Sequence, residues 1–335
     1  MNMSECPSLQ AAHTYCSERL FKTAQELENI VKGPSDNIAV FAVGSYGRHE
    51  AAESVSDFEW ITVYDDALVG VEEARRYQAD LTGYFASVFG RKFLSINKTF
   101  GETCSISDLC TNVGGEADTN RTLTYRMLVL AEGTALKKNC AHTKIIQSLA
   151  ATYASSFTAG HRMLSLATDI ARYWRTLRID YKFKVDEGKK PWAVRSMKLR
   201  SSRRVWYLAS AMHFVAFGPR IDYSKTREFD LASVAGFMSQ MGGNPVLRML
   251  ASAEKLAADP SVLEKLLSLY DAIHLELNDE TLRSYLDTLD GSYRFDDPRY
   301  ESVHSKCVEL HRTAATLILT LPDEVRREFL EMFLL

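Results

Sequence analysis

Two acidic residues, Asp57 and Glu59, alternate along one short segment and follow a Gly44-Ser45 pair by about a dozen residues. Successive side chains of an extended chain point to opposite faces, so the two carboxylates share one face, about 7 Å apart. Like charges placed in this way repel each other unless a cation lies between them. Magnesium accepts carboxylate and phosphate oxygens together. The spacing therefore predicts a site for a divalent cation and a nucleoside triphosphate.

Apolar runs on both sides of this pattern predict the strands that position it. Residues 38–43 are almost wholly apolar and stop at Gly44, and residues 58–64 are rich in aromatic and β-branched side chains. A turn that opens a short helix presents unpaired N–H groups at the positive end of the helix dipole. We therefore expect Ser45 and the amides after Gly44 to hold the β- and γ-phosphates.

This combination resembles the signature of the DNA polymerase β-like nucleotidyltransferase superfamily. The string GSYGRHE at residues 44–50 is similar to the branch that contains the uridylyltransferases of the PII nitrogen-regulatory protein. The string NVGGEADTNRTLTYRMLVLAEG at residues 112–133 also resembles that branch. The resemblance covers roughly residues 38–133 and is looser beyond them. It implies transfer of a nucleoside monophosphate from a triphosphate, ATP among the candidates, with Mg2+ or Mn2+ as the metal.

The superfamily usually completes its metal site with a third carboxylate, and two residues are candidates here. Asp118 matches the acid that opens the helix of the resembling branch. The resemblance thus implies catalytic and metal-binding roles for Asp57, Glu59 and Asp118. A plain helix N-cap is the alternative role of Asp118, and Glu102 is the second candidate ligand. Glu59 stands where the superfamily usually has aspartate, a replacement that it tolerates.

Three cationic or titratable residues near these motifs need separate interpretation. Arg48 follows the Gly-Ser turn and is a candidate phosphate contact, with a salt bridge to Glu50 or another nearby acid as the alternative. Arg126 lies in an otherwise apolar helix, where a buried guanidinium needs an acidic partner. We expect that partner to be structural. His49 is expected in solvent rather than in catalysis.

A basic segment, residues 172–204, stands out in a chain whose formal net charge is -3. Helical spacing places Arg175, Arg178 and Lys182 in one stripe beside an apolar face. We expect this stripe to bind the nucleotide, because an acidic triphosphate needs cationic partners that the first domain barely supplies. RNA binding would use the same residues, and a solvated face is the plain alternative. The tryptophans of this part of the chain are expected mostly in the core: Trp174, Trp192 and Trp206.

The whole pattern predicts an α+β protein, with a small α/β domain built on a mixed sheet and an all-helical domain after it. The expected division is an N-terminal helix at 1–35, a nucleotidyltransferase domain at 36–140 and a helical substrate- or nucleotide-binding domain at 141–335. Residues 92–100 fit a third strand. Helices are expected at 8–32, 71–88, 119–131, 143–157, 159–184, 192–217, 231–241, 244–258, 261–289, 304–321 and 322–335.

Cysteine usage and hydropathy argue against several classes of protein. The six cysteines contain no C-x-x-C pair, which argues against a zinc site or a disulfide framework and suits a reducing cytosol. The N-terminus lacks the pattern of a secretion signal. No apolar run approaches the ~20 residues that a membrane helix needs. We therefore expect a cytoplasmic protein without a membrane partner.

The acceptor is not fixed by the sequence. The resemblance to PII-modifying enzymes favours a protein side chain, while small molecules and RNA 3′ ends stay open. The rival interpretation is a non-catalytic nucleotide-binding module. The incomplete set of three carboxylates favours it, and the intact pair of Asp57 and Glu59 argues against it. A toxin-like RNA modifier is a further alternative if the basic segment lines a groove that leads to Asp57.

Overall fold

The computed structural model describes residues 2–30, 36–53, 55–96, 100–111, 113–156, 158, 161–186, 192–289 and 296–334. The chain forms two compact units. The sheet unit comprises His13–Asp169 and Gly218–Asn244, and the helical unit comprises Met1–Ala12, Ile170–Phe217 and Pro245–Leu335. The sequence instead suggested a division near residue 140.

A four-stranded mixed sheet forms the centre of the sheet unit, with the order β3-β2-β1-β4. Strand β1 (Ile38–Val43) runs antiparallel to β2 (Glu59–Tyr64) and to β4 (Thr134–Ala135), and β2 runs parallel to β3 (Thr103–Ser105). The register pairs Val43 with Glu59. The prediction of a mixed sheet flanked by helices is thus confirmed, and so are both strands around the Gly-Ser turn.

The expected third strand at residues 92–100 is wrong for the residues that the structure describes there. The segment begins as a 3-10 turn, Arg91–Phe93, and makes one isolated bridge, between Leu94 and Phe58. Residues 97–99 of that prediction lie outside the described residues. Strand β3, slightly later in the chain, occupies the edge of β2 instead.

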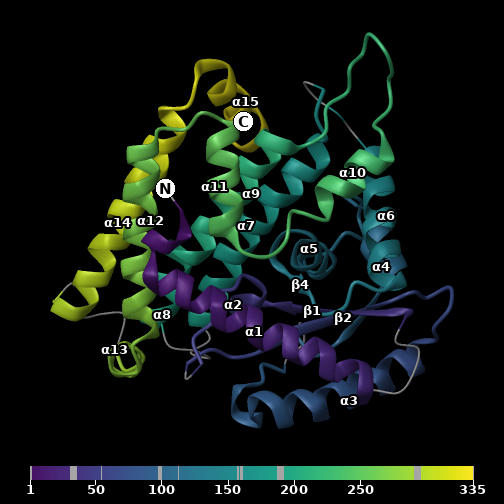
Figure 1. The fold of residues 1–335 in the computed structure, drawn as a ribbon, viewed down its shortest axis with the longest axis horizontal. Helices are drawn as coiled ribbons and strands as arrows, with labels where there is room; N and C mark the ends of the chain where they lie inside the picture. The colour runs from purple at the N-terminus through teal and green to yellow at the C-terminus, as the bar shows by residue number, and fades with distance from the viewer. Residues whose placement is uncertain are drawn as a thin grey trace. The chain divides into compact units, whose positions relative to one another are not determined.

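Helices α1 (Pro7–Ile30) and α3 (Val71–Phe89) cover one face of this sheet (Figure 1). Phe58 and Trp60 point to that face, where Phe58 stacks on Phe89 with ring centroids 3.9 Å apart and Trp60 meets Phe85 at 4.9 Å. Buried aromatic side chains of this size dominate the energy of a core. Because side chains alternate along β2, Glu59 points to the opposite face.

The opposite face of β1 is covered by α6 (Cys140–Ala154), whose His142 ring contacts Phe41 at 5.8 Å. Other helices of the unit are α2 (Gly44–Gly47), α4 (Ile106–Cys110), α5 (Asn120–Met127) and α10 (Leu231–Met238). The expected helix from residue 119 to 131 continues past α5 as a π-helical segment, Leu128–Glu132. Its N-cap is Thr119, whose hydroxyl accepts the Thr122 N–H.

The helical unit contains no strand among the residues that the structure describes. The helix expected at 192–217 is divided at residue 201, and the helix expected at 261–289 is divided at Asp279. Asp279 is the N-cap of the helix that follows it, because its side chain accepts the Leu282 N–H at 2.7 Å. Its helices are α7 (Leu164–Asp186, within this unit from Ile170), α8 (Trp192–Arg200), α9 (Ser202–Phe217), α11 (Pro245–Lys255), α12 (Pro260–Asn278), α13 (Glu280–Leu286), α14 (Pro298–Leu319) and α15 (Asp323–Phe333).

Two further features concern the cysteines and the apolar helices. All six cysteines are free thiols. Within the described ranges, no helix combines the length and the apolar character that crossing a membrane requires.

Candidate functional site

The Gly-Ser turn and the acidic strand lie against each other in the sheet unit. Gly44 follows directly after β1 and has a φ of +65°, a conformation that costs glycine nothing. A Cβ atom added to Gly44 would lie 2.0 Å from Glu59 Oε2. The pairing of Val43 with Glu59 across the two strands explains this closeness. The structure therefore joins two motifs that are separated in the sequence.

Ser45 and Asp57 offer polar groups that the protein itself does not use. Ser45 is partly exposed, and its hydroxyl forms no hydrogen bond with any residue in the described ranges. Asp57 is exposed and likewise has no hydrogen bond or ion pair there. Phe58, between the two acids, is fully buried on the other face. Asp57 and Glu59 are thus arranged on one face, as the alternation predicted.

A buried carboxylate that the sequence reasoning missed, Glu132, fixes the turn from behind. It is fully buried, and its Oε1 accepts the Gly44 N–H at 3.0 Å and the Arg48 Nη1–H at 2.8 Å. Arg48 is also buried and donates from Nε to Glu50 Oε2 at 2.8 Å. A lone acid at the end of the apolar run LVLAE was the available signal.

These contacts decide between the two interpretations of Arg48. The salt bridge to Glu50, with Glu132 as a second partner, is confirmed. The guanidinium therefore supports the turn from inside the protein, and it is not presented to a ligand as a free cation. Gly47 also has a structural reason for lacking a side chain, because a Cβ atom there would lie 2.5 Å from the Ala42 carbonyl oxygen.

Asp118 belongs to a different buried cluster. Its Oδ2 accepts a hydrogen bond from Arg126 Nη2 at 2.9 Å, and its Oδ1 lies 2.9 Å from Nη1 of the same guanidinium. The carboxylate also accepts from the Gly114 N–H and the Thr122 hydroxyl. These bonds outweigh burial and hold the pKa of Asp118 well below its usual range. The helix cap is the neighbouring Thr119, so the N-cap alternative for Asp118 is wrong.

Arg126 is the centre of this cluster, and the prediction of a structural partner for it is confirmed. It is fully buried and also binds Asp169 at 3.0 Å and the Tyr153 hydroxyl at 3.2 Å. Tyr153 in turn donates to Asp169 at 2.7 Å. Glu102, the other candidate third ligand, pairs with Arg121 at the surface.

The carboxylates do not form a three-ligand metal site in the described part of the chain. No group of three or more His, Cys, Asp or Glu side chains is arranged there to hold a metal ion. The resemblance had implied that Asp118 is the third ligand, but the structure does not bring Asp118 together with Asp57 and Glu59. The pair that remains suits magnesium, which proteins often bind through one or two carboxylates while substrate phosphates and water fill the other positions.

His49 lies directly after the turn and is partly buried rather than solvated, contrary to expectation. Its φ is +57°, and its ring packs 5.0 Å from that of His13. Nε2 lies 3.2 Å from Thr134 Oγ1, and Nδ1 lies 3.1 Å from Ser17 Oγ. The Thr134 hydroxyl donates to the Gly47 carbonyl, so it accepts from His49. Burial, together with the neighbouring His13, lowers the pKa of His49 to about 4.

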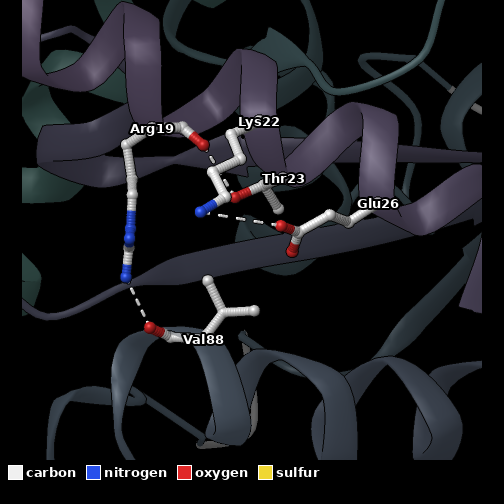
Figure 2. A pocket seen from close by; sticks show the side chains of 5 residues that line it. All are labelled: Arg19, Lys22, Thr23, Glu26 and Val88. Atoms are coloured by element: carbon white, nitrogen blue, oxygen red, sulfur yellow. Dashed lines mark hydrogen bonds and ion pairs between the residues drawn. The ribbon is translucent and has the colours of Figure 1, made fainter.

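A separate small cavity of about 210 Å³ lies between α1 and α3. Figure 2 shows Arg19 reaching across it to the Val88 carbonyl oxygen, and Lys22 facing Glu26 at 3.9 Å. None of the predicted site residues lines this cavity. Its one acid, Glu26, and one of its two cations, Lys22, pair with each other, and Arg19 donates to the Val88 carbonyl, while Arg19 Nε has no hydrogen-bond partner within the described ranges.

The predicted basic stripe belongs to the helical unit. Arg175 and Arg178 are exposed on α7, and the side chain of Lys182 lies outside the described residues. Nucleotide binding by the stripe therefore stays a prediction. The expectation of a core position is confirmed for Trp206, which is fully buried. Trp174 and Trp192 are partly buried and stack on Tyr207 and Tyr300.

Comparison with known proteins does not place the chain in a family. No protein-family model, no curated protein and no solved structure matches it.

Proposed function

We propose that the protein is a nucleotidyltransferase, which moves a nucleoside monophosphate from a triphosphate to an acceptor hydroxyl or phosphate. The packing of the Glu59 carboxylate against Gly44 is the observation that carries this proposal. A phosphate-binding turn and a pair of metal-binding acids must be adjacent to act on one triphosphate. The exposure of Asp57 and the unused hydroxyl of Ser45 provide the further support.

The side chains at the turn and on the acidic strand have separate roles in the proposed reaction. Ser45 donates a hydrogen bond to an oxygen of the terminal phosphates. Asp57 and Glu59 hold the divalent cation. When bound, such a cation neutralises phosphate charge and lowers the pKa of the attacking hydroxyl. Arg48 and Glu132 act as positioning residues, because they fix the backbone of the turn without contacting the substrate.

The reaction itself forms one bond and breaks another at the α-phosphorus. The acceptor oxygen attacks that phosphorus and loses its proton, and pyrophosphate leaves with the electron pair of the broken bond. The resemblance to PII-modifying enzymes favours a protein side chain as the acceptor. The proposed location of the protein is the cytoplasm.

A labelling experiment tests the proposal. The full chain is incubated with each of the four α-32P nucleoside triphosphates, with Mg2+ or Mn2+ and a cell lysate, and the protein and RNA fractions are counted separately. Asp57→Asn and Glu59→Gln should each lose transfer by about 100-fold or more, since the metal supplies several kcal/mol of charge stabilisation. Glu53→Gln, a change at a nearby exposed acid, is the matched control. Full activity in Asp57→Asn contradicts the proposal.

A non-catalytic nucleotide-binding module is the second candidate, and one observation favours it. The third carboxylate expected for catalysis is held in the Arg126 cluster instead. Calorimetry with each triphosphate and Mg2+ separates the two functions. A module of this kind binds a triphosphate, loses the binding in Asp57→Asn and labels nothing in any fraction.

A further inference from the structure

The outer face of α7 in the helical unit carries charge that the protein does not neutralise. Arg175 and Arg178 are both exposed, and neither forms a hydrogen bond or an ion pair with any residue in the described ranges. Two adjacent guanidinium groups that no carboxylate in the described ranges pairs with leave a local positive field in a protein whose formal net charge is -3.

The same helix face also exposes large apolar side chains. Ile179 is 72% exposed and Phe183 is 57% exposed. Arg175, Ile179 and Phe183 follow each other at intervals of four residues, which places them in one row along about 12 Å of helix. This row therefore joins one cation to two exposed apolar side chains, and Arg178 lies beside it, so the face is neither a plain solvated face nor a purely apolar docking face.

A second set of cations continues this surface onto α8, α9 and α14. Arg204 donates to Nδ1 of His311, and its guanidinium lies 6.0 Å from the centre of the Trp174 ring. Arg200, one turn before Arg204, bonds only to the Ser196 hydroxyl within the described ranges. Burial, followed by the positive charges of Arg178 and Arg200, lowers the pKa of Arg204. The guanidinium groups are therefore close enough to repel one another.

We propose that this surface, formed by Arg175, Arg178, Ile179, Phe183, Arg200 and Arg204, binds single-stranded RNA. Guanidinium groups bind phosphate oxygens in a fixed fork geometry. Exposed aromatic groups next to such cations stack on bases, and this combination is the general means of holding single strands. A free triphosphate or an inorganic phosphate would use the arginines but not the apolar row. The inference goes beyond nucleotidyl transfer and does not depend on it.

Fluorescence anisotropy with a labelled 20-nucleotide RNA tests this site on the full chain, without nucleotide or divalent cation. Binding should weaken as salt rises, and the double variant Arg175→Gln/Arg178→Gln should lower the slope of log affinity against log salt by about 1.4, from about 0.7 per phosphate contact. Phe183→Ser should weaken binding about five- to 150-fold at every salt concentration, through lost stacking.

Arg312→Gln is the matched control, because Arg312 is an exposed arginine of the same unit that already pairs with Glu309 at 4.0 Å. It should bind RNA as the wild type does. The proposal is overturned if the double variant behaves like this control, or if polyglutamate competes as well as RNA at equal charge. Binding of acidic lipid vesicles without binding of RNA also overturns it. Running the assay in Asp57→Asn keeps this result separate from the fate of the transferase proposal.

Discussion

Gly44→Ala tests directly whether the turn and the acidic strand meet as the structure has them. Alanine at position 44 must adopt the left-handed backbone conformation that Gly44 has, at a cost of about 1–2 kcal/mol. Its methyl group also lies 2.0 Å from Glu59 Oε2, so the carboxylate must move by about 1.4 Å to reach an ordinary contact of 3.4 Å. Oε2 is the end of a flexible side chain that can turn aside, so the added cost is at the low end of overpacking, about 1 kcal/mol.

A double-mutant cycle separates these two costs. In a Glu59→Ala background the overlapping atoms are absent, so Gly44→Ala should cost only the conformational part, about 1–2 kcal/mol. The free energy of unfolding is measured by urea denaturation for the four proteins, with a common m value as the check on comparability. The expected coupling between the two positions is about 1 kcal/mol.

The cycle also has a neutral control within the same unit. Gly83 lies inside α3, and a Cβ atom added there meets nothing within 4 Å. Gly83→Ala should therefore stabilise the protein by about 0.5–1 kcal/mol. A Gly44/Glu59 coupling below about 0.5 kcal/mol, the usual error of additivity, would show that Glu59 does not pack on the turn. The structural basis of the proposed function would then be lost.

Three further predictions concern the surroundings of this site. Arg126→Met leaves the carboxylates of Asp118 and Asp169 buried without their cation and should cost about 3–5 kcal/mol of unfolding free energy; a loss below 1 kcal/mol would show that the cluster is not a tight ion pair. The pKa of His49 is about 4 in the folded protein and about 6.5 when unfolded, so stability should fall by about 3 kcal/mol as pH drops from 7 to below 4. His49→Asn, which tolerates a positive φ, should flatten that pH profile; an unchanged profile refutes the assignment. Triphosphate binding measured by calorimetry should need Mg2+, and Glu132→Gln, which keeps an oxygen for the Gly44 N–H, should raise the metal-free affinity; equal wild-type affinities with and without Mg2+ contradict this electrostatic account.

The local pattern was enough to predict the elements around the turn. The apolar run that becomes β1, the alternation that becomes β2 and the stop at Gly44 are short-range features, and each follows from the conformational preferences of neighbouring residues. The same logic placed Asp57 and Glu59 on one face. It was wrong for the described part of residues 92–100, because a strand forms only where a neighbouring strand has a free edge, and β3 takes the edge of β2.

The partners of the charged residues depended on the tertiary structure and were harder to predict. Arg48 and Glu132 are far apart in the chain, and only the packing of the π-helical segment behind the turn brings them within 2.8 Å. Asp118 could serve the site or the core equally well by its position in the sequence. Asp118 pairs with the buried guanidinium of Arg126 in the core, because a buried cation without a partner costs far more free energy than the loss of one metal ligand.

The negative charges around the turn oppose the binding of any anionic ligand. Glu50, Glu132, Asp57 and Glu59 place four carboxylates around Gly44 and the segments next to it, and Arg48 is already paired with two of them. At an effective dielectric constant near 20, one unit charge 4 Å away contributes about 4 kcal/mol. A triphosphate therefore cannot approach this turn on hydrogen bonds alone. Either a divalent cation at Asp57 and Glu59 reverses the local field, or the turn does not bind phosphate. Any phosphate bound at this turn would therefore need a cation beside it, and this condition of charge is independent of the family resemblance.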